Sequence, residues 1–439
     1  MKNKSINRRR FLKKAAGTAV GAIGFPYLIP SSALGKAGTI APSNRIVMGT
    51  IGVGSQGTSD MKGFLSKSEV QMAAVCDVDR KHRDKAKQIV NTKYQNNDCR
   101  TYLDFRDLIA RGDLDAVCLA LPDQWHGIIS VAAARAGLDI HGQKPLARTI
   151  VEGRVICDAV KRYGVVWQTG SQQRSSRNFH YACELVRNGR LGKVHRVDVG
   201  LPTGQSCDPQ PPLPVPEELD WNMWLGPAPW RPFCDFGQGS CHLDWRWIMD
   251  YSGGRLTDWA GHHVDIAHWG LGLEYTGPVE IEGKGVFPRD GLYNVPIEYK
   301  IKCKYANGLV MNISNSDHDR SKPISMGAKW YGEKGWLHVK RSGIWAEPES
   351  ILKEVIGPDE IRLYESRDHK QNFLDCVRTR KLTVAPVEVA HRSISVALLG
   401  EIAMLTGRKL KWDPQDEQFI NDDEAARLLS RPMRSPWHL

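Results

Sequence analysis

A glycine-rich turn constrains this chain more than any other feature of its sequence. Residues 46–53 form an apolar run, and Gly52, Gly54 and Gly57 follow with the spacing G-x-G-x-x-G before a helical stretch. Such glycines allow a tight turn and a close approach of ligand to backbone, and the following helix N-terminus favours a phosphate. Asp77 comes twenty residues after Gly57, at the end of the next apolar run. The pattern predicts a dinucleotide-binding unit; a glycine turn without a dinucleotide is the alternative.

The residues expected to hold the dinucleotide lie in this turn and at later strand ends. In an open parallel sheet, ligands bind outside the carboxyl ends of the strands, and Leu121 and Lys144 each follow an apolar run. A carboxylate accepts hydrogen bonds from ribose hydroxyls and repels a 2′-phosphate, so Asp77 predicts NAD over NADP, although Arg80 could partly relax this preference. The predicted cofactor contacts are Gly52, Gly54, Ser55, Gln56, Gly57, Asp77, Leu121, Pro122, His126 and Lys144.

The alternation of elements predicts an α/β fold with two domains. A chain of 439 residues exceeds the size at which one hydrophobic core stops growing. Apolar runs alternate with amphipathic stretches from 45 to 169, which predicts a doubly wound parallel sheet. Later strand-like runs have no helices long enough for crossovers between them, which predicts a large, mostly antiparallel open sheet. The expected organisation is an export signal at 1–40, a Rossmann NAD(P)-binding domain at 41–172, and a substrate-binding α/β domain with a final helix and tail at 173–439.

The first forty residues carry the features of an export signal. Arg8, Arg9 and Arg10 precede Phe-Leu-Lys, and a mildly apolar stretch and small residues follow. The paired arginines resemble the twin-arginine signal, which sends proteins out folded. We therefore expect the twin-arginine export machinery as a partner, a location in the periplasm or outside the cell, and no membrane attachment after cleavage. An ordinary signal for unfolded export and an uncleaved anchor are the alternatives.

Charge and cysteine usage narrow the function classes further. The formal net charge is +11, but eight unopposed lysines and arginines lie in residues 1–40, which leaves +3 for the rest of the chain. That small charge, with no basic stripe interleaved with aromatic residues, predicts no nucleic-acid partner. The ten cysteines include no Cys-x-x-Cys pair, and free thiols are favoured, although one disulfide among Cys207, Cys234 and Cys241 is possible on sequence alone.

A candidate catalytic cluster follows a Gly-Gly pair. Asp258, His262 and Asp265 have spacings of four and three residues, which return to one face of a helix. Oxidation of an alcohol needs a base that withdraws the hydroxyl proton, and a histidine beside a carboxylate titrates in the useful range. Lys144, at its strand end, could reach a substrate beside the nicotinamide, or be merely solvated. The alternatives for the histidine are helix packing, or a metal site made from His242, His262, His263 and His268; we predict no metal.

Together these motifs resemble one known family. The glycine-rich turn, x-Lys-Pro after a strand, and Asp-x-x-x-His-x-x-Asp after Gly-Gly are similar to the glucose-fructose oxidoreductase, inositol dehydrogenase and rhizopine-catabolism family, written Gfo/Idh/MocA, and the tail resembles its exported bacterial branch. The resemblance implies that Lys144 anchors the substrate hydroxyl, His262 is the acid/base, and Asp258 helps to hold the sugar. One departure is Gln143, where the family usually has a glutamate that would favour the charged lysine. The predicted substrate contacts are Lys144, Arg174, Arg246, Asp258, His262 and His263.

The resemblance implies an exported oxidoreductase that acts on a ring hydroxyl of a sugar or glycoside, passing hydride to tightly bound NAD. A redox-neutral, NAD-dependent glycoside hydrolase or lyase that oxidises its substrate transiently is the first alternative, and a non-catalytic carbohydrate-binding protein the second. Seven of the fourteen tryptophans lie in residues 221–269, where indole rings could pack on sugar rings or simply on each other. A large open sheet also predicts a homo-oligomer.

Overall fold

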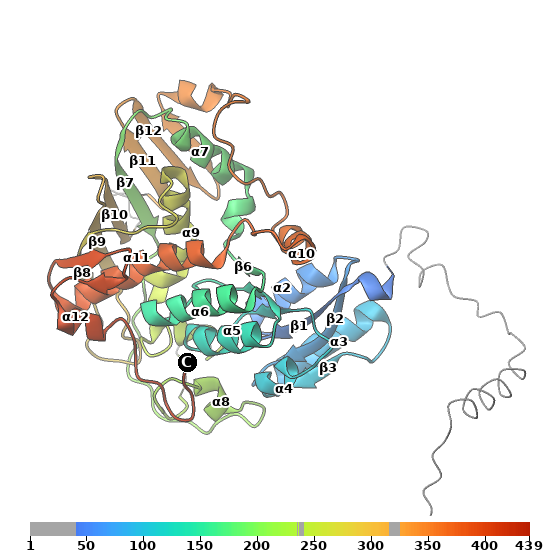
Figure 1. The fold of residues 1–439 in the computed structure, drawn as a ribbon. Coiled ribbons are helices and arrows are strands. Elements are labelled where there is room, and N and C mark those ends of the chain that lie inside the picture. The colour runs from blue at the N-terminus through green and yellow to red at the C-terminus, as the bar shows by residue number, and fades with distance from the viewer. Residues whose placement is uncertain (1–40, 235, 237–240, 316–324) are drawn as a thin grey trace, which may run out of the picture. The chain divides into compact units, whose positions relative to one another are not determined.

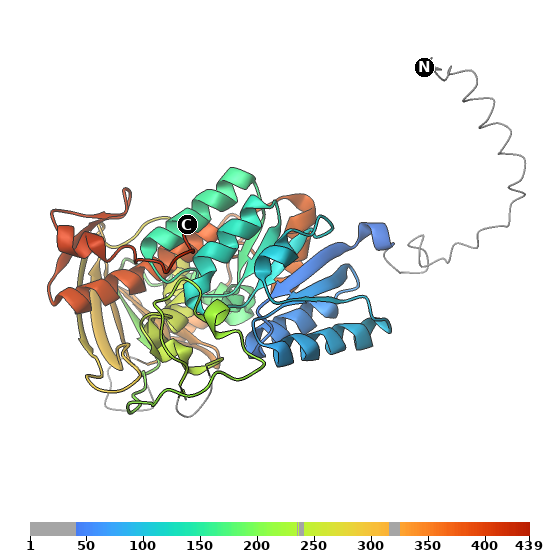
Figure 2. The same cartoon turned by 90° about the horizontal axis from the view of Figure 1, so that it is seen from below.

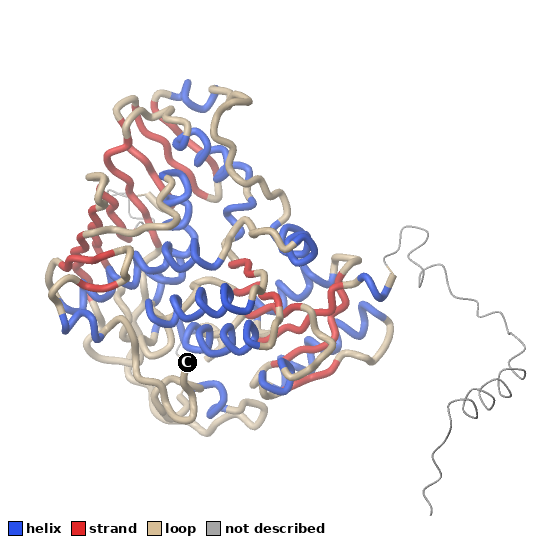
Figure 3. The backbone as a smooth tube through the Cα atoms, viewed as in Figure 1, coloured by secondary structure: helices blue, strands red, loops and turns tan. Residues whose placement is uncertain are grey.

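The computed structural model describes residues 41–234, 236, 241–315 and 325–439, so the predicted export signal lies outside the described residues (Figure 1). Strands within this range gather in two separate groups (Figure 3). The first group is a six-stranded sheet in which each neighbouring pair is parallel, with the order β3-β2-β1-β4-β5-β6. This is the strand order of a dinucleotide-binding Rossmann domain, as predicted. Its strands are β1 (Ile46–Ile51), β2 (Val70–Cys76), β3 (Arg100–Tyr102), β4 (Ala116–Leu119), β5 (Asp139–Gly142) and β6 (Trp167–Thr169).

Amphipathic helices provide the crossovers between these strands. Phe64 and Met61, on the helix after the glycine-rich turn, are fully buried in a core cluster that includes Met48 and Met72 of the sheet. Thr149 caps one crossover helix through its side chain, and Gly164 ends it in the left-handed conformation with φ of 65°. The helices are α2 (Ser55–Leu65), α3 (Arg80–Tyr94), α4 (Phe105–Ile109), α5 (His126–Arg135) and α6 (Ile150–Tyr163).

Within the described residues, the second group is a nine-stranded sheet with the order β13-β12-β11-β7-β10-β9-β8-β14-β15. Its pairs are antiparallel except for β7 with β10, so the prediction of a mostly antiparallel sheet is confirmed. The strands are β7 (Val194–Leu201), β8 (Glu280–Val286), β9 (Glu298–Lys304), β10 (Val310–Asn315), β11 (Gly327–Gly332), β12 (Gly335–Lys340), β13 (Gly343–Glu347), β14 (Leu410–Asp413) and β15 (Gln418–Phe419).

Helices α7, α9 and α11 pack against this second sheet (Figures 1 and 2). The α9 helix is buried along nearly its whole length, and Trp330 of the sheet donates a hydrogen bond to the carbonyl of Ala267 at 3.3 Å. By length and composition α11 could span a membrane, but 83% of its most apolar window is buried inside the protein, as in a core helix. The helices after the first sheet are α7 (Arg177–Arg187), α8 (Trp221–Leu225), α9 (Gly254–Leu271), α10 (His369–Thr379), α11 (Val387–Thr406) and α12 (Asp423–Arg427).

Late segments of the chain return to the first sheet. Phe373 of α10 joins the core of that sheet, with its ring 5.9 Å from that of Phe64. Near the C-terminus, the ring of Trp437 lies 4.7 Å from that of Trp125, which precedes α5. Segments that follow most of the second sheet in sequence thus return to complete the packing of the first sheet.

Candidate active site

The glycine-rich turn closes tightly at the carboxyl end of β1. Gly52 has φ of +82°, and a Cβ there would lie 2.2 Å from the carbonyl oxygen of Ala120; a Cβ on Gly57 would lie 1.9 Å from the carbonyl oxygen of Gly52. Gly54 stands at the N-cap of α2, where a Cβ would find no atom closer than 3.9 Å. The turn therefore presents open backbone at a helix N-terminus, which suits a pyrophosphate.

Asp77 lies beside this turn with its carboxylate held in place. One oxygen accepts the N–H of Val53 at 2.8 Å and the other accepts the N–H of Asp79 at 2.9 Å. Burial opposes ionisation, but the neighbouring His82 ring and these two N–H groups outweigh it, so the pKa of Asp77 is below its ordinary value. An ionised carboxylate in this groove can accept ribose hydroxyls, and the residues present fit a dinucleotide.

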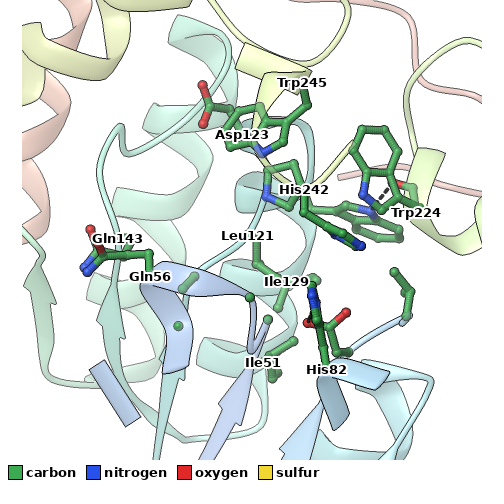
Figure 4. Close-up of a pocket in the computed structure, with 18 of the residues that line it drawn as sticks. Ile51, Gln56, His82, Leu121, Asp123, Ile129, Gln143, Trp224, His242 and Trp245 are labelled. Carbon is green, nitrogen blue, oxygen red and sulfur yellow. Dashed lines mark hydrogen bonds and ion pairs between the residues drawn. The ribbon is translucent and has the colours of Figure 1, made fainter. Parts of the chain in front are cut away.

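A segment before α9 covers the groove from the opposite side. Trp224 and Trp245 face Leu121 and Ile129 across the groove (Figure 4). The indole N–H of Trp125 donates to the carbonyls of Met223 and Trp224, both at 3.1 Å, and so fixes this cover on the first sheet. The residues 219–234 and 241–247, which we call the cover segment, are further attached through the N–H of Asp220, which donates to the carbonyl of Val78 at 3.1 Å.

A second cleft, with a volume of about 700 Å³, continues from the groove. The two cavities share a set of residues, namely Gln56, Gln143, Lys144, Arg246 and Asp258. His262, Trp259, Arg255 and Arg341 line only the second cleft. A ligand in the second cleft would therefore meet the end of a dinucleotide at the shared residues.

Lys144 and Asp258 form the junction between the two cavities. Lys144 follows β5, Asp258 lies in the second turn of α9, and the lysine ammonium donates to one oxygen of the carboxylate. Arg255 donates to the other oxygen at 3.1 Å. Burial opposes ionisation of Asp258, but Lys144, Arg246 and Arg255 together hold its pKa well below the ordinary value. The pair is thus a charged junction that a substrate hydroxyl can join by hydrogen bonding.

His262 lies one turn along α9 from Asp258 and is 4% exposed. Burial first, then the charges of Lys144 and Arg341, hold the pKa of His262 well below its ordinary value. Its Nδ1 atom is buried without a hydrogen-bond partner among the described residues. The imidazole is therefore neutral at pH 7 and can accept a proton.

Arg174 and Asp265, two residues singled out in the sequence, pair with each other. Asp265 accepts from the Arg174 guanidinium in a buried, bidentate ion pair, at 2.7 and 2.9 Å. Arg174 is 2% exposed, also contacts Glu274 at 3.3 Å, and lines neither of the two cavities. This pair instead joins α9 to the segment after β6.

Two predicted histidine contacts are also placed away from the cavities. His126 lies behind the groove, where its ring nitrogens contact the carbonyls of Pro145 at 2.6 Å and Leu121 at 3.0 Å. It therefore positions the backbone that lines the groove and does not itself line it. His263 is 1% exposed and stacks on Trp259 at 5.5 Å between ring centroids, so it packs behind the second cleft. The other predicted residues line one or both cavities: Gly52, Gly54, Ser55, Gln56, Gly57, Asp77, Leu121, Pro122, Lys144, Arg246, Asp258 and His262.

Gln143 is held by a residue that the sequence did not suggest. Its amide N–H donates at 2.7 Å to Asp60, a buried residue of α2 that also binds Lys370 of α10 at 3.0 Å and Gln56 at 3.1 Å. Burial opposes ionisation of Asp60, but the charges of His141 and Lys370 hold its pKa below the ordinary value. A glutamate at 143 would face this carboxylate, so an amide is the compatible side chain here.

The tryptophans of 221–269 divide between the buried core and the linings of the two cavities. Trp221 and Trp224 stack at 4.7 Å within a buried cluster, which is core packing. Trp224 also lines the groove, and Trp247 and Trp259 line the second cleft, where they can meet a ligand ring. No disulfide joins any of the ten cysteines, all of which lie within the described residues.

The suggested histidine metal site does not form. His268 contacts the hydroxyl of Tyr305 at 2.6 Å, while His263 stacks on Trp259. Among the described residues, one group has a geometry that could hold a metal ion, and it consists of Asp79, His82 and His242. Of the four histidines suggested from the sequence, this group contains only His242.

Comparison with known proteins finds matches to both halves of the described chain. The family models described as "Oxidoreductase family, NAD-binding Rossmann fold" and "Oxidoreductase family, C-terminal alpha/beta domain", both of the Gfo/Idh/MocA group, match residues 46–171 and 184–439. An alpha-N-acetylgalactosaminidase of Shewanella oneidensis is 30% identical over 214 residues, which cover 43% of this chain and 44% of that protein. A glycosyl hydrolase family 109 protein of Shewanella sp. (strain MR-4) is 31% identical over the same share. The match thus spans less than half the length of these relatives.

Solved structures share the fold at low identity. The WlbA dehydrogenase from Bordetella pertussis, in complex with NADH and UDP-GlcNAcA, has a TM-score of 0.61 and 16% identity, with 84% of this chain and 99% of that chain covered. The aldose-aldose oxidoreductase from Caulobacter crescentus has a TM-score of 0.59 and 18% identity, with the same coverage.

Proposed function

The chain belongs to the Gfo/Idh/MocA oxidoreductase family, and from this premise we propose that it oxidises a ring hydroxyl of a sugar or glycoside with NAD as the hydride acceptor. The observation that carries the proposal is the shared lining of the two cavities by Lys144 and Asp258, with His262 immediately beyond them. With a substrate in the second cleft, this arrangement would place the reacting hydroxyl beside a cation and a neutral base, at the end of a dinucleotide groove.

The protein's own residues divide the work of this reaction. When bound, the nicotinamide supplies the site that takes up hydride from the substrate carbon. His262, neutral because burial and nearby cations depress its pKa, takes the hydroxyl proton at its imidazole. Lys144 donates a hydrogen bond to the hydroxyl oxygen and stabilises the negative charge that develops there. Asp258 fixes the lysine and can accept a second sugar hydroxyl.

A second candidate is net hydrolysis by a redox-neutral cycle, in which the substrate is oxidised, eliminates its glycosidic substituent as an alcohol, adds water in its place, and is reduced again by the same cofactor. The hydrolase names of the Shewanella relatives favour it. The deciding experiment supplies glycosides to purified protein, with and without added NAD, and identifies the sugar products. A free sugar released without net reduction of nicotinamide supports the cycle, and a keto sugar formed in step with reduced nicotinamide supports oxidation. Intact glycosides under every condition would contradict both candidates.

We further propose that the protein is exported folded, to the periplasm or beyond, by the twin-arginine machinery. The basis is the Arg8-Arg9-Arg10 leader. Free dinucleotide is not dependably supplied outside the cytoplasm, so the nicotinamide would be loaded before transit and retained. The cover segment, which places Trp224 and Trp245 over the groove, supports such retention.

Protein purified without added cofactor is therefore expected to contain nearly one nicotinamide per chain. The groove lies between the first sheet and the cover segment, so a dinucleotide there should dissociate slowly. The measurement is denaturation of the purified protein followed by quantification of the nucleotide released. Largely empty protein that is active only with excess NAD would contradict retention and favour an ordinary dissociable cofactor.

Asp77→Ala is expected to lower the preference for NAD over NADP by roughly 10- to 100-fold, because the change removes a charged hydrogen-bond acceptor and its repulsion of a 2′-phosphate. The measurement is the affinity of nucleotide-free protein, refilled with either dinucleotide. Asp113→Ala, whose side chain is 59% exposed on the same domain, is the matched control and should leave the preference unchanged. A parent protein that already prefers NADP would refute the assignment of Asp77.

A further inference from the structure

Among the residues that the structure describes, the lining of the second cleft has more cationic than anionic side chains. Its lining contains the cations Lys144, Arg246, Arg255 and Arg341 and the carboxylates Asp244 and Asp258. Asp258 is shared among Lys144, Arg255 and, at 3.9 Å, Arg246. One carboxylate thus serves three cations, and the excess charge is available to a ligand.

Arg341 carries the clearest uncommitted charge. It lies in the turn between β12 and β13, and among the residues that the structure describes no carboxylate comes within the 4.0 Å of an ion pair. Its guanidinium lies 4.7 Å from the ring centroid of Trp259. The side-chain amide of Gln173 is oriented so that both of its neighbours are satisfied. Its oxygen accepts a hydrogen bond from Arg341 Nε at 3.2 Å, and its nitrogen donates one to the carbonyl of His262 at 3.1 Å. Arg341 is therefore oriented at the cleft by neutral groups.

A bound dinucleotide would not contact two of these cations, Arg255 and Arg341. Arg255 and Arg341 line the second cleft and are absent from the lining of the groove that would hold the pyrophosphate. Arg255 also packs against Trp247, at 5.1 Å from the ring centroid, which directs it along the wall of the second cleft. The excess positive charge therefore faces the substrate.

We propose that the substrate is a sugar bearing an oxyanion substituent, a carboxylate or a sulfate ester, which Arg341 and Arg255 recognise in the second cleft. The proposal rests on the proposed function and names its substrate class. Guanidinium groups bind two oxygens of a carboxylate or of a tetrahedral oxyanion through two parallel hydrogen bonds, and the indole of Trp259 can pack on the sugar ring beside them. An oxyanion would also offset the cations that depress the pKa of His262 and so strengthen it as a base.

Binding to the nicotinamide-loaded protein tests the proposal without requiring turnover. The probes are methyl glucuronide, methyl glucoside 6-sulfate and neutral methyl glucoside, with the matching galactosides, measured by titration calorimetry. We expect an acidic probe to bind roughly 10- to 100-fold more tightly than its neutral counterpart, with the difference falling as salt rises. Comparison of the glucuronide with the 6-sulfate shows whether the cleft prefers a carboxylate or a sulfate ester.

Variants of Arg341 and Arg255 test whether these two side chains cause the preference for an acidic substrate. Arg341→Gln and Arg255→Gln should each reduce the preference for the acidic probe by about tenfold, and Arg341→Lys should restore part of it. Arg367→Gln, whose side chain is 89% exposed, is the control and should bind as the parent does. Equal affinity for acidic and neutral probes, equal losses for both in the arginine variants, or no measurable binding of any acidic probe would overturn the proposal. Tight binding of an acidic probe without any reaction would instead contradict the proposed oxidation and leave the selection standing.

Discussion

Replacement of His262 by alanine is expected to lower turnover by roughly 10²–10⁴-fold while the protein keeps its fold and its nicotinamide. His262 lines the second cleft and not the dinucleotide groove, so its loss removes the proton acceptor without touching the cofactor. Lys144→Met should have an effect of similar size, because it removes the hydrogen bond to the substrate oxygen. Turnover is measured from product formation, and nicotinamide content after denaturation.

His263→Gln is the matched control for this prediction. His263 is the next residue of the same helix, equally buried, but it stacks on Trp259 behind the cleft. Its replacement should change stability more than catalysis. Near-normal rates in His262→Ala, or a His263 variant that is correctly folded and equally inactive, would mean that the base lies elsewhere.

Gly54→Val is expected to weaken nicotinamide binding roughly 100-fold while the fold survives. A Cβ at Gly54 meets no atom closer than 3.9 Å, so the side chain fits the protein but occupies the space beside the helix N-terminus that a pyrophosphate needs. This site is preferable to Gly57, where a Cβ would lie 1.9 Å from a backbone oxygen and disturb the turn itself. Nicotinamide content and circular dichroism are the two measurements.

The control for this variant is Gly112→Ala, in a loop of the same domain where a Cβ meets nothing within 4 Å. It should retain full nicotinamide content. If Gly54→Val also retains it, the dinucleotide does not approach the turn as we infer.

The first sheet was predictable because its signals are local. Five of its six strands lie in short apolar runs, the exception being β3 (Arg-Thr-Tyr), and the glycine spacing and Asp77 lie within one strand–helix–strand unit. Part of the second sheet was missed for the opposite reason. In β13 only Ala346 of five residues is buried, so it lacks the alternation that marks a half-buried strand, and in β11 the alternating stretch is only four residues long between two glycines.

The sequence could not show which charged groups of the site pair across long stretches of chain. Arg174 and Asp265 pair with each other although they lie 91 residues apart. Arg341 carries no motif, since a turn between two strands gives no sign of the cleft that it faces. The end of a strand singled out Lys144, and helical spacing singled out Asp258 and His262, but only the fold could show which charges surround them.

The packing of α10 and the C-terminus against the first sheet sets an order for biosynthesis. A ribosome delivers the dinucleotide-binding half first, yet Phe373 of α10 packs beside Phe64 in the core of the first sheet, and Trp437 packs against Trp125. A nascent chain that does not yet include α10 therefore lacks part of the core that supports its nucleotide site. We expect the cofactor to be loaded only after these late segments are in place, and residues 41–172 cut out alone would lack side chains that close their own core.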